Sequence, residues 1–339
     1  MILPVEPSKI IRVRSYARAG LAGNPSDGYF GKTLSFTLKN FYAEIVIYRS
    51  QDLELLPGPR DSSVYSDLTS MVQSINDHGY YGGLRLLQAT LKRFTEHCAQ
   101  HEISFSKKNF SMRYFTNIPS RVGMAGSSAI IISCLRALMR FYDVKIEQPE
   151  LANLALSVEI KELGIGAGLQ DRVAQVYEGL TFMDFDRELM ESRGYGQYES
   201  LNTSLLVNIY LAYKVELSEG SELFHNDLRG RFDSGEPEVV NAMGRWADIA
   251  DEVRTVLLQG KHHDIGDLLD ANFDLRKSIC RILPDNIAMV DAARSVGASA
   301  KFTGSGGAII GQYKDEKMYQ ELENTLAPLG IIILKPEFI

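Results

Sequence analysis

The segment from Pro119 to Ala129 carries residue types that together can hold an anion such as a phosphate group. Its sequence, Pro-Ser-Arg-Val-Gly-Met-Ala-Gly-Ser-Ser-Ala, places two glycines and two adjacent serines directly before an apolar run at 130–142. Glycine lets backbone N–H groups approach an anion closely, and the positive end of the helix predicted by the apolar run adds to that attraction. The alternative is that Ser127 or Ser128 only caps the helix, a role that needs one serine and no glycine.

A second turn gathers polar side chains that suit a substrate with many hydroxyl groups. It follows a predicted strand at 10–18 and contains Arg18, Asn24, Ser26 and Asp27. Carboxylate, amide and hydroxyl groups between them accept and donate hydrogen bonds with sugar hydroxyls. An Asx-turn built by these asparagine and aspartate residues is the alternative, and it requires no ligand.

Two carboxylates, Glu159 and Asp171, stand twelve positions apart on either side of a glycine-rich break at 164–168. If the fold brings them together, one can hold Mg²⁺ while the other accepts a proton or stabilises a cation. For Asp171, a helix-start carboxylate on the surface is the alternative.

A third glycine-rich turn, at 301–308, contains Gly304 and Gly306 and allows close backbone approach to a ligand. A plain hairpin turn is the alternative. His262 and His263 are adjacent, which is not the spacing of metal ligands, and we expect the six histidines to form no cluster.

Hydrophobic patterns predict the elements that must position these turns. Predicted strands lie at 10–18, 34–48, 111–116 and 179–184, predicted helices at 81–100, 128–142, 149–163 and 169–177, and a loop at 51–61. A polar stretch at 186–202 predicts a domain boundary. Beyond it, strands are predicted at 205–213, within 298–311 and at 330–334, and helices at 236–260, 264–281, 285–296 and 315–327. This order resembles a split β-α-β, ferredoxin-like plan.

The bulk composition excludes several function classes. The 339 residues are long enough for two domains. A net charge of −7 argues against a nucleic-acid partner, because neutralising phosphates needs a basic surface. No apolar run has the length of a membrane span, and the first residues do not read as a signal peptide. The three cysteines form no CxxC pair, which favours a reduced, cytoplasmic chain.

In this order and at these separations, the three turns resemble the motifs of the GHMP kinases, which include galactokinase, homoserine kinase, mevalonate kinase and phosphomevalonate kinase. The turn at 18–27 lies where galactokinases carry Arg-Val-Asn-Leu-Ile-Gly-Glu-His-Thr-Asp, the stretch at 126–129 matches the phosphate loop, and the turn at 301–307 resembles the third motif. Asn24-Pro25 replaces the sugar-reading Glu-His pair of galactokinases, which argues against galactose. The phosphate loop is also one residue longer than usual. The form of both stretches is most similar to the glucuronokinases.

The resemblance implies an α+β, two-domain GHMP-kinase-like fold. Its N-terminal mixed α/β domain would span 1–190, with the phosphate loop at 119–129, and its ferredoxin-like C-terminal domain would span 200–339, with the glycine-rich motif at 301–308. The implied activity is that of an ATP-dependent sugar kinase, which converts D-glucuronate to D-glucuronate 1-phosphate with ATP as co-substrate and Mg²⁺ as cofactor. A GHMP kinase for a neutral sugar or a mevalonate-like acid is the alternative, followed by a non-catalytic sugar or nucleotide sensor. No nucleic-acid or membrane partner is expected.

By the same resemblance, Asp171 is the base or orients the sugar hydroxyl, and Arg18 steadies Asp171 and the transferring phosphoryl group. Ser128 and Glu159 would hold Mg²⁺, although the longer loop leaves open which serine meets the ion. A uronate also needs a cation for its carboxylate, for which Arg121 ranks before Lys32. The predicted ATP phosphate-binding residues are Gly123, Ala125, Gly126, Ser127, Ser128, Gly304 and Gly306. The predicted substrate-binding residues are Asn24, Ser26, Asp27, Lys32 and Arg121.

Overall fold

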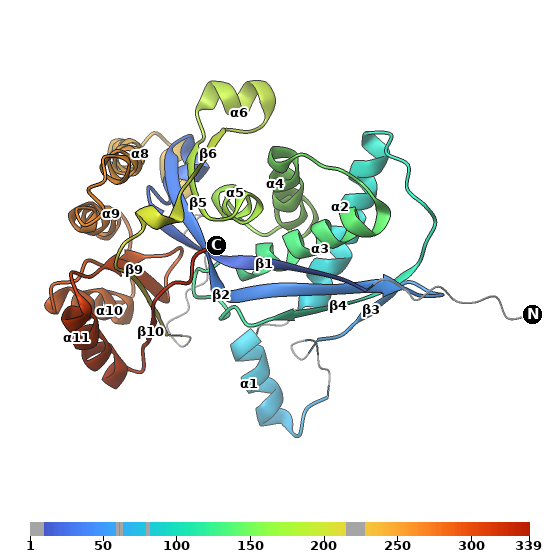
Figure 1. Ribbon diagram of the computed structural model, residues 1–339, viewed down its shortest axis with the longest axis horizontal. Coiled ribbons are helices and arrows are strands. Elements are labelled where there is room, and N and C mark those ends of the chain that lie inside the picture. Colours follow the sequence, from blue (N-terminus) through green and yellow to red (C-terminus); the bar gives the residue numbers. More distant parts are fainter. Residues whose placement is uncertain (1–9, 59–60, 62–63, 79–81, 215–227) are drawn as a thin grey trace, which may run out of the picture.

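In the described chain, six strands form a sheet that occupies one side of the molecule (Figure 1). The computed structural model describes residues 10–58, 61, 64–78, 82–214 and 228–339. The strand order is β3-β4-β2-β5-β6, and β1 pairs with β2 outside this path. The β3–β4 pair is parallel and the other pairs are antiparallel. The strands are β1 (Ile11–Ala22), β2 (Lys32–Arg49), β3 (Glu54–Leu56), β4 (Phe110–Thr116), β5 (Leu180–Asp184) and β6 (Gln197–Leu201).

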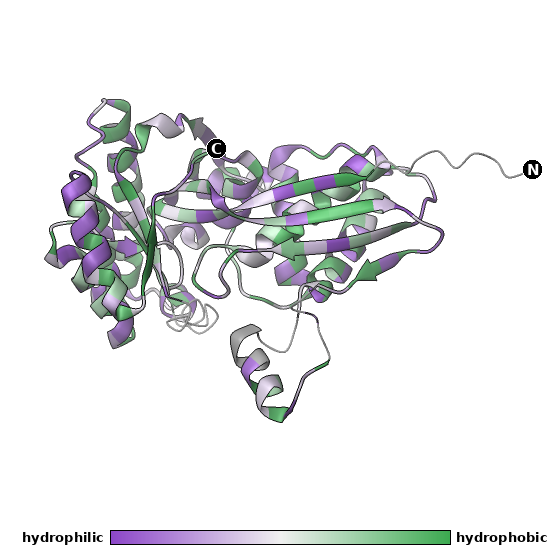
Figure 2. Ribbon diagram, turned by 60° about the horizontal axis from the view of Figure 1, so that its bottom comes forward, coloured by the Kyte–Doolittle hydropathy of each residue, from purple (hydrophilic) through white to green (hydrophobic). Residues whose placement is uncertain are grey.

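The long strand β2 joins the parts of this sheet because its two ends pair with different strands. Residues 43–49 pair with β4, and residues 32–36 pair with β5. Every residue from Thr33 to Leu38 is fully buried, whereas only the odd positions are fully buried from Ala43 to Ile47. This change coincides with a register shift between β1 and β2, and such an irregularity bends a strand and re-aims its side chains. Figure 2 shows hydrophobic and hydrophilic residues following one another along the long strands.

Helices cover one face of this sheet, whereas α1 lies on its other side (Figure 1). The helix α3 packs against β1 and β2, and every residue from Ser128 to Leu135 is buried and most of them are apolar, as a central helix requires. The α-helical part of the next segment, α4, passes directly into a π-helical turn, η3. The elements are α1 (Leu68–His78), α2 (Gly83–Gln100), α3 (Gly126–Tyr142), α4 (Gln148–Ser157), η3 (Val158–Glu162), α5 (Gln170–Tyr177) and α6 (Arg187–Arg193), with a 3₁₀ turn η1 (Ser26–Tyr29).

A second sheet, of four antiparallel strands in the described chain, has the order β10-β7-β9-β8. Helices α8 to α10 separate β7 from β8, and α11 separates β9 from β10, which is the order of a split β-α-β plan. Helix α8 also packs against β1 and β2 of the first sheet, with Trp246 fully buried, so the two sheets share a core. The elements are β7 (Ile209–Tyr213), α8 (Pro237–Leu258), α9 (Gly266–Ile279), α10 (Pro284–Ser295), β8 (Lys301–Phe302), β9 (Ala308–Gln312), α11 (Glu316–Leu326) and β10 (Ile332–Leu334), with 3₁₀ turns at Thr203–Leu205 and Ala327–Leu329.

Several segments differ from the sequence prediction. Strand β1 continues past residue 18 to Ala22, because residues 19–22 still pair with β2. The predicted loop at 51–61 contains β3, and the predicted helix at 149–163 ends as the π-helical turn η3. The polar stretch at 186–202 contains α6 and β6, and β6 pairs with β5, so this stretch belongs to the first sheet. The division into domains between residues 190 and 200 stays a prediction.

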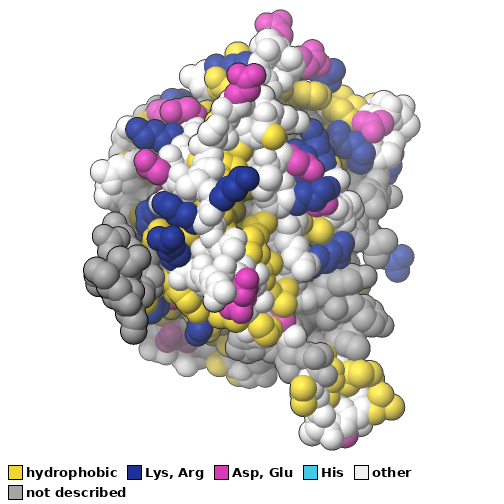
Figure 3. Space-filling view, turned by 90° about the vertical axis from the view of Figure 1, so that its right-hand side faces the viewer, with side chains coloured by type: hydrophobic (Ala, Val, Ile, Leu, Met, Phe, Trp, Pro, Cys, Tyr) yellow, Lys and Arg dark blue, Asp and Glu magenta, His cyan; other side chains and the backbone are white. Residues whose placement is uncertain are grey.

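The surface carries charges of both signs. On the face shown in Figure 3, Lys and Arg side chains are interspersed with Asp and Glu. A nucleic-acid backbone would therefore meet no continuous basic strip on this face. Of the helices within the described residues, none combines the length and hydropathy that crossing a bilayer would require.

Candidate active site

The loop before α3 has the backbone geometry of an anion cradle. Every second residue of this loop has a positive φ: 60° at Arg121, 70° at Gly123 and 60° at Ala125. Left-handed residues that alternate with right-handed ones turn successive N–H groups toward one side, which forms an anion-binding concavity. The side chain of Gln175 fixes the end of the loop, because its Nε2 donates to the Ala125 carbonyl at 2.9 Å. The loop then enters α3 at Gly126, where the helix N-terminus favours negative charge.

The third glycine-rich turn packs directly against this loop. A Cβ at Gly304 would lie 2.5 Å from the Gly123 carbonyl oxygen, and a Cβ at Gly123 would lie 2.9 Å from the Ser305 nitrogen. Both positions therefore need glycine for the two backbones to touch. Arg276 of α9 holds the turn from behind: Nη1 donates to the Gly304 carbonyl at 2.7 Å and Nη2 to the Ser305 carbonyl at 2.6 Å. The sequence prediction did not include Arg276.

Arg18 of β1 connects the three motifs. Its guanidinium donates to the Thr303 carbonyl at 2.6 Å, to the Gly123 carbonyl at 3.3 Å, and to the Asp171 carboxylate. The Arg18 residue is only 5% exposed, whereas the Asp171 side chain is 24% exposed at the start of α5. The buried cation thus holds an accessible carboxylate beside this loop, and the catalytic roles predicted for the two residues stay predictions.

A buried chain of polar groups links Asp171 to the phosphate loop. Arg172 forms an ion pair with Glu159, and its Nη1 lies 3.4 Å from an Asp171 oxygen. Glu159 is 1% exposed in the π-helical turn, and its other oxygen accepts a hydrogen bond from Ser127 Oγ at 2.7 Å. The sequence prediction missed Arg172. Its signal was indirect, since a buried glutamate requires a cationic partner.

The two loop serines have different environments. The prediction paired Ser128 with Glu159, but Ser128 is fully buried and its hydroxyl donates to the Ala125 carbonyl at 3.1 Å. Ser127 is the serine that contacts Glu159. A serine hydroxyl and a carboxylate oxygen are the hard donors that Mg²⁺ prefers, and these two are 2.7 Å apart, so the pair fits that ion.

One predicted substrate residue, Asp27, lies at this centre. Its Oδ2 accepts a hydrogen bond at 3.3 Å from the backbone nitrogen of Gln170, the residue that precedes Asp171 in the chain. Burial, and then the negative charge of Asp171, raise the pKa of Asp27 to about 6. Gly168 allows this approach, because a side chain there would overlap the Asp27 carboxylate.

The structure does not present three other predicted substrate residues for binding. Asn24 is 6% exposed and its Oδ1 accepts from buried Lys301 at 2.7 Å. Ser26 is fully buried and donates to the Lys32 carbonyl at 2.9 Å. The Lys32 ammonium lies 2.5 Å from Asp251 and 3.7 Å from Asp184.

The Asn24 and Ser26 side chains therefore form hydrogen bonds inside the protein, whereas the Lys32 ammonium is partly exposed and paired with two aspartates. Hydrogen bonding to Asp251 raises the pKa of Lys32, which keeps it charged and paired. Arg121 is exposed on the loop before α3.

Comparison with known proteins finds a matching family and similar kinases. Residues 85–179 match the family model described as GHMP kinases N terminal domain. The chain is 42% identical to Glucuronokinase 1 of Arabidopsis thaliana, over 88% of this chain and 84% of that protein. It is 44% identical to Probable glucuronokinase 2 of the same plant, over 88% of this chain and 82% of that protein. The chain belongs to the GHMP kinase family. The predicted family membership is thereby confirmed.

Solved structures of other GHMP kinases share the fold. Mevalonate kinase of Methanococcus jannaschii superposes with a TM-score of 0.71 at 19% identity, covering 99% of this chain and 100% of that one. Galactokinase of Lactococcus lactis, complexed with galactose, gives a TM-score of 0.76 at 14% identity, covering 97% and 94%. The predicted α+β GHMP-kinase-like fold is confirmed by these similarities.

Proposed function

We propose that this GHMP kinase phosphorylates D-glucuronate with ATP and releases D-glucuronate 1-phosphate and ADP. The observation that carries the proposal is the identity of 42% and 44% to two glucuronokinases across 88% of the chain. Relatives with other acceptors match less of it: a heptose 7-phosphate kinase of Campylobacter jejuni is 28% identical over 52% of this chain. The polar turn that would read the sugar differs from that of galactokinases at Asn24-Pro25, which supports an acceptor other than galactose.

In the proposed reaction, Asp171 accepts the proton of the sugar's anomeric hydroxyl group. The oxygen of that hydroxyl group attacks the γ-phosphorus of ATP. The new oxygen–phosphorus bond forms while the bond from that phosphorus to the leaving ADP oxygen breaks. Asp171 suits this role because it is accessible yet fixed by Arg18. The same guanidinium lies against the phosphate loop through the Gly123 carbonyl, where it can stabilise charge on the transferring group.

The backbone N–H groups of residues 123–128 would hold the ATP phosphates, and Gly304 and Gly306 would border them. Ser127 and Glu159 would hold Mg²⁺, and Arg172 fixes the Glu159 carboxylate from its other side. When bound, the ion would neutralise negative charge on the phosphates and keep them aligned. The chain's own part is positioning, which supplies much of the catalysis in phosphoryl transfer.

For the acceptor, we assign the substrate carboxylate to Arg121, whose guanidinium can bind it with two parallel hydrogen bonds. Asp27 lies beside Asp171 and can bond a sugar hydroxyl. With a pKa of about 6, it carries a proton in part of the molecules near neutral pH, and a protonated carboxyl can donate as well as accept.

The test is a coupled assay of ADP release with glucuronate, galacturonate, galactose, arabinose and mevalonate as acceptors. We expect glucuronate to give the highest kcat/KM. A higher kcat/KM for a neutral sugar or for mevalonate would show that the proposed acceptor is wrong and that the kinase activity is right. ADP release with none of the five would favour a sugar or nucleotide sensor.

The role of Asp171 has a separate test. Asp171→Asn should fold normally and lose roughly 10²–10⁴-fold in kcat, the usual effect of removing a general base. Asp291→Asn, an exposed position on α10, is the matched control and should retain full activity. Near-normal turnover by Asp171→Asn would remove this residue from the role.

A further inference from the structure

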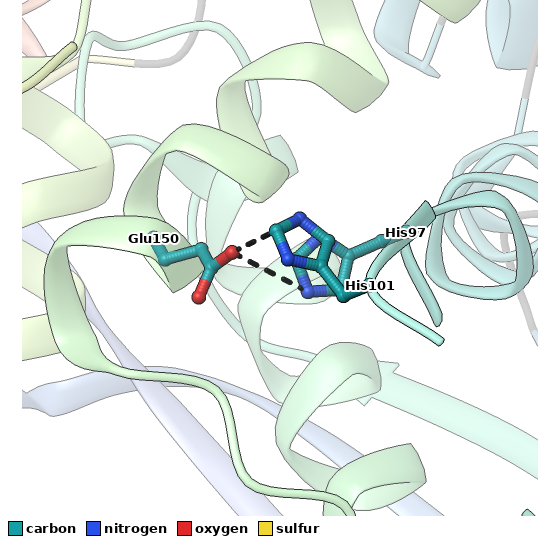
Figure 4. Close-up of side chains that lie close together, drawn as sticks. All are labelled: His97, His101 and Glu150. Carbon is teal, nitrogen blue, oxygen red and sulfur yellow. Dashed lines mark ion pairs between the residues drawn. The ribbon is translucent and has the colours of Figure 1, made fainter. Parts of the chain in front are cut away.

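Three potential metal ligands meet between α2 and α4, outside the proposed kinase site. His97 lies in the last turn of α2, His101 is the C-cap residue that follows this helix, and Glu150 lies in the first turn of α4. The Nε2 atoms of His97 and His101 lie 3.7 and 3.3 Å from Glu150 Oε1. Figure 4 shows both imidazoles lying beside this carboxylate. One potential ligand atom from each of these three residues lies within 4.8 Å of the other two. This corrects the expectation that the histidines form no cluster.

The geometry suits a tetrahedral ion with nitrogen and oxygen ligands. Zinc binds histidine nitrogen and carboxylate oxygen at roughly 2.0–2.2 Å, which places two ligands of one tetrahedral ion about 3.3 Å apart. The two distances to Glu150 are 3.3 and 3.7 Å, so small side-chain rotations suffice. Two histidines four residues apart on a helix are a known zinc-binding spacing, and here the second histidine directly follows the last residue of α2. The His101 and Glu150 side chains are 51% and 41% exposed, so solvent can supply the fourth ligand.

The surrounding protein fixes the distance between the two helices without any ion. Along α2, Arg93 Nε donates to Ser157 Oγ at 3.1 Å, and Lys92 Nζ lies 2.6 Å from a Glu162 oxygen. Further along, Arg85 donates to the Leu163 carbonyl at 3.3 Å. The histidines extend this series of contacts at the other end of α2. A site whose backbone is held in place before binding loses little entropy when the metal binds.

We propose that His97, His101 and Glu150 form a binding site for a divalent transition-metal ion such as Zn²⁺, which joins α2 to α4. Imidazole ligands favour Zn²⁺ and its neighbours, whereas Mg²⁺ favours oxygen. The site is therefore chemically distinct from the Ser127–Glu159 pair. Because α4 leads directly into the π-helical turn with Glu159, the ion would also brace the segment behind the kinase site.

The experiment titrates untagged full-length protein with Zn²⁺ by calorimetry, in buffer with excess Mg²⁺ to occupy oxygen-ligand sites. The variants are His101→Ala and Glu150→Gln, both at exposed side chains, and the control is His263→Ala, an exposed histidine elsewhere. We expect the wild type and the control to bind a single Zn²⁺ per chain. Each site variant should bind about tenfold more weakly or worse. Co²⁺ should give the intense visible absorption of tetrahedral coordination in the wild type and not in the variants.

Thermal unfolding gives an independent readout. Zn²⁺ should raise the Tm of the wild type and of His263→Ala, because a ligand that binds the folded state stabilises it by mass action. It should leave the Tm of His101→Ala and Glu150→Gln unchanged. Equal Zn²⁺ affinity in the wild type and both site variants would overturn the proposal. So would absence of Zn²⁺ binding by the wild type, which would reduce the cluster to a contact between Glu150 and the two imidazoles.

Discussion

Ser127 and Ser128 are neighbours in the chain, but their hydroxyls have different partners. Ser127 donates to the Glu159 carboxylate, and Ser128 donates to the Ala125 carbonyl within the loop. We therefore expect Ser127→Ala to raise the Mg²⁺ concentration needed for half-maximal rate, because it removes a proposed ligand. Ser128→Ala should keep the Mg²⁺ dependence and reduce the free energy of unfolding by about 0.5–1.5 kcal/mol, the net value of a typical hydrogen bond.

Initial rates against Mg²⁺ concentration, with denaturant unfolding of both variants, separate these outcomes. Each serine variant serves as the control for the other, since they differ by one position in the same helix. If Ser128→Ala raised the Mg²⁺ concentration for half-maximal rate more than Ser127→Ala did, Ser128 would be the metal ligand, as the family resemblance implied.

Asp27 gives the molecule a pH-dependent stability. Burial and the charge of Asp171 raise its pKa to about 6, whereas an unfolded aspartate has a pKa of about 3.9. Between these values the folded state binds more protons than the unfolded state, so this residue's contribution to stability falls as pH rises. The Asp27→Asn variant does not titrate. It should become more stable relative to the wild type between pH 4 and pH 7, by up to about 3 kcal/mol.

Urea unfolding at pH 4.5 and pH 7 measures this difference, with Asp291→Asn as the exposed control. For the control, the difference in free energy of unfolding from the wild type should be nearly the same at the two pH values. If this difference were also the same at both pH values for Asp27→Asn, a raised pKa of Asp27 would be contradicted.

At the scale of elements, the site depends on contact between two loops from distant parts of the chain. The backbones at Gly123 and Gly304 approach so closely that a methyl group on Gly304 would lie 2.5 Å from the opposing carbonyl oxygen. In Gly304→Ala the loops must separate, which moves Arg18's acceptors apart and widens the phosphate cradle. Because a misplacement of about 1 Å can reduce a rate roughly 10²-fold, we expect a large fall in kcat/KM for ATP.

Steady-state kinetics with varied ATP tests this expectation. Gly244→Ala is the matched control, since Gly244 is exposed in α8 with open space around the added methyl group. This control should keep its activity and gain about 0.5–1 kcal/mol in stability, because alanine favours a helix more than glycine does. Unchanged kinetics in Gly304→Ala would show that the contact is not required.

The elements also show what sequence reasoning can and cannot predict here. Long periodic segments such as β2 and α3 were predictable because one face, or nearly all, of each is buried. Strand β6 was not, because it is an edge strand whose mostly half-exposed side chains read as a polar linker. The π-helical turn η3 was hidden because its residues continue the helical pattern of α4.

Residue partners were less predictable than motifs. The order of the glycine turns indicated a shared site, but Arg172 and Arg276 could be assigned only once the fold placed Glu159 and the 304–305 carbonyls beside them. The sequence indicated only part of the histidine cluster: one histidine at the end of the predicted helix 81–100 and a second one just after it. Its third member, Glu150, comes from another helix, and only tertiary packing brings it near.

At the scale of the whole molecule, groups from both ends of the chain join to hold the polar turn at 18–27. Lys301 donates to Gly20 and Asn24, and Asn272 Oδ1 accepts from the Gly23 nitrogen at 2.8 Å. Lys32 likewise ties β2 to Asp251 on α8. Polar residues in this turn that look like ligands in sequence therefore hold the two sheets together.

The two cations predicted for the substrate carboxylate, Lys32 and Arg121, can be distinguished by mutation. Lys32 is paired with two carboxylates, so Lys32→Ala should leave the KM for glucuronate unchanged and lower stability by less than about 1 kcal/mol, as for a partly exposed ion pair. Arg121→Ala should raise the KM for glucuronate but not for a neutral sugar, because only the acid has a carboxylate to bind. Steady-state kinetics on both acceptors and denaturant unfolding provide the comparison. A rise in the glucuronate KM confined to Lys32→Ala would mean that this lysine exchanges Asp251 for the substrate, and that the contact between the sheets loosens whenever the acceptor binds.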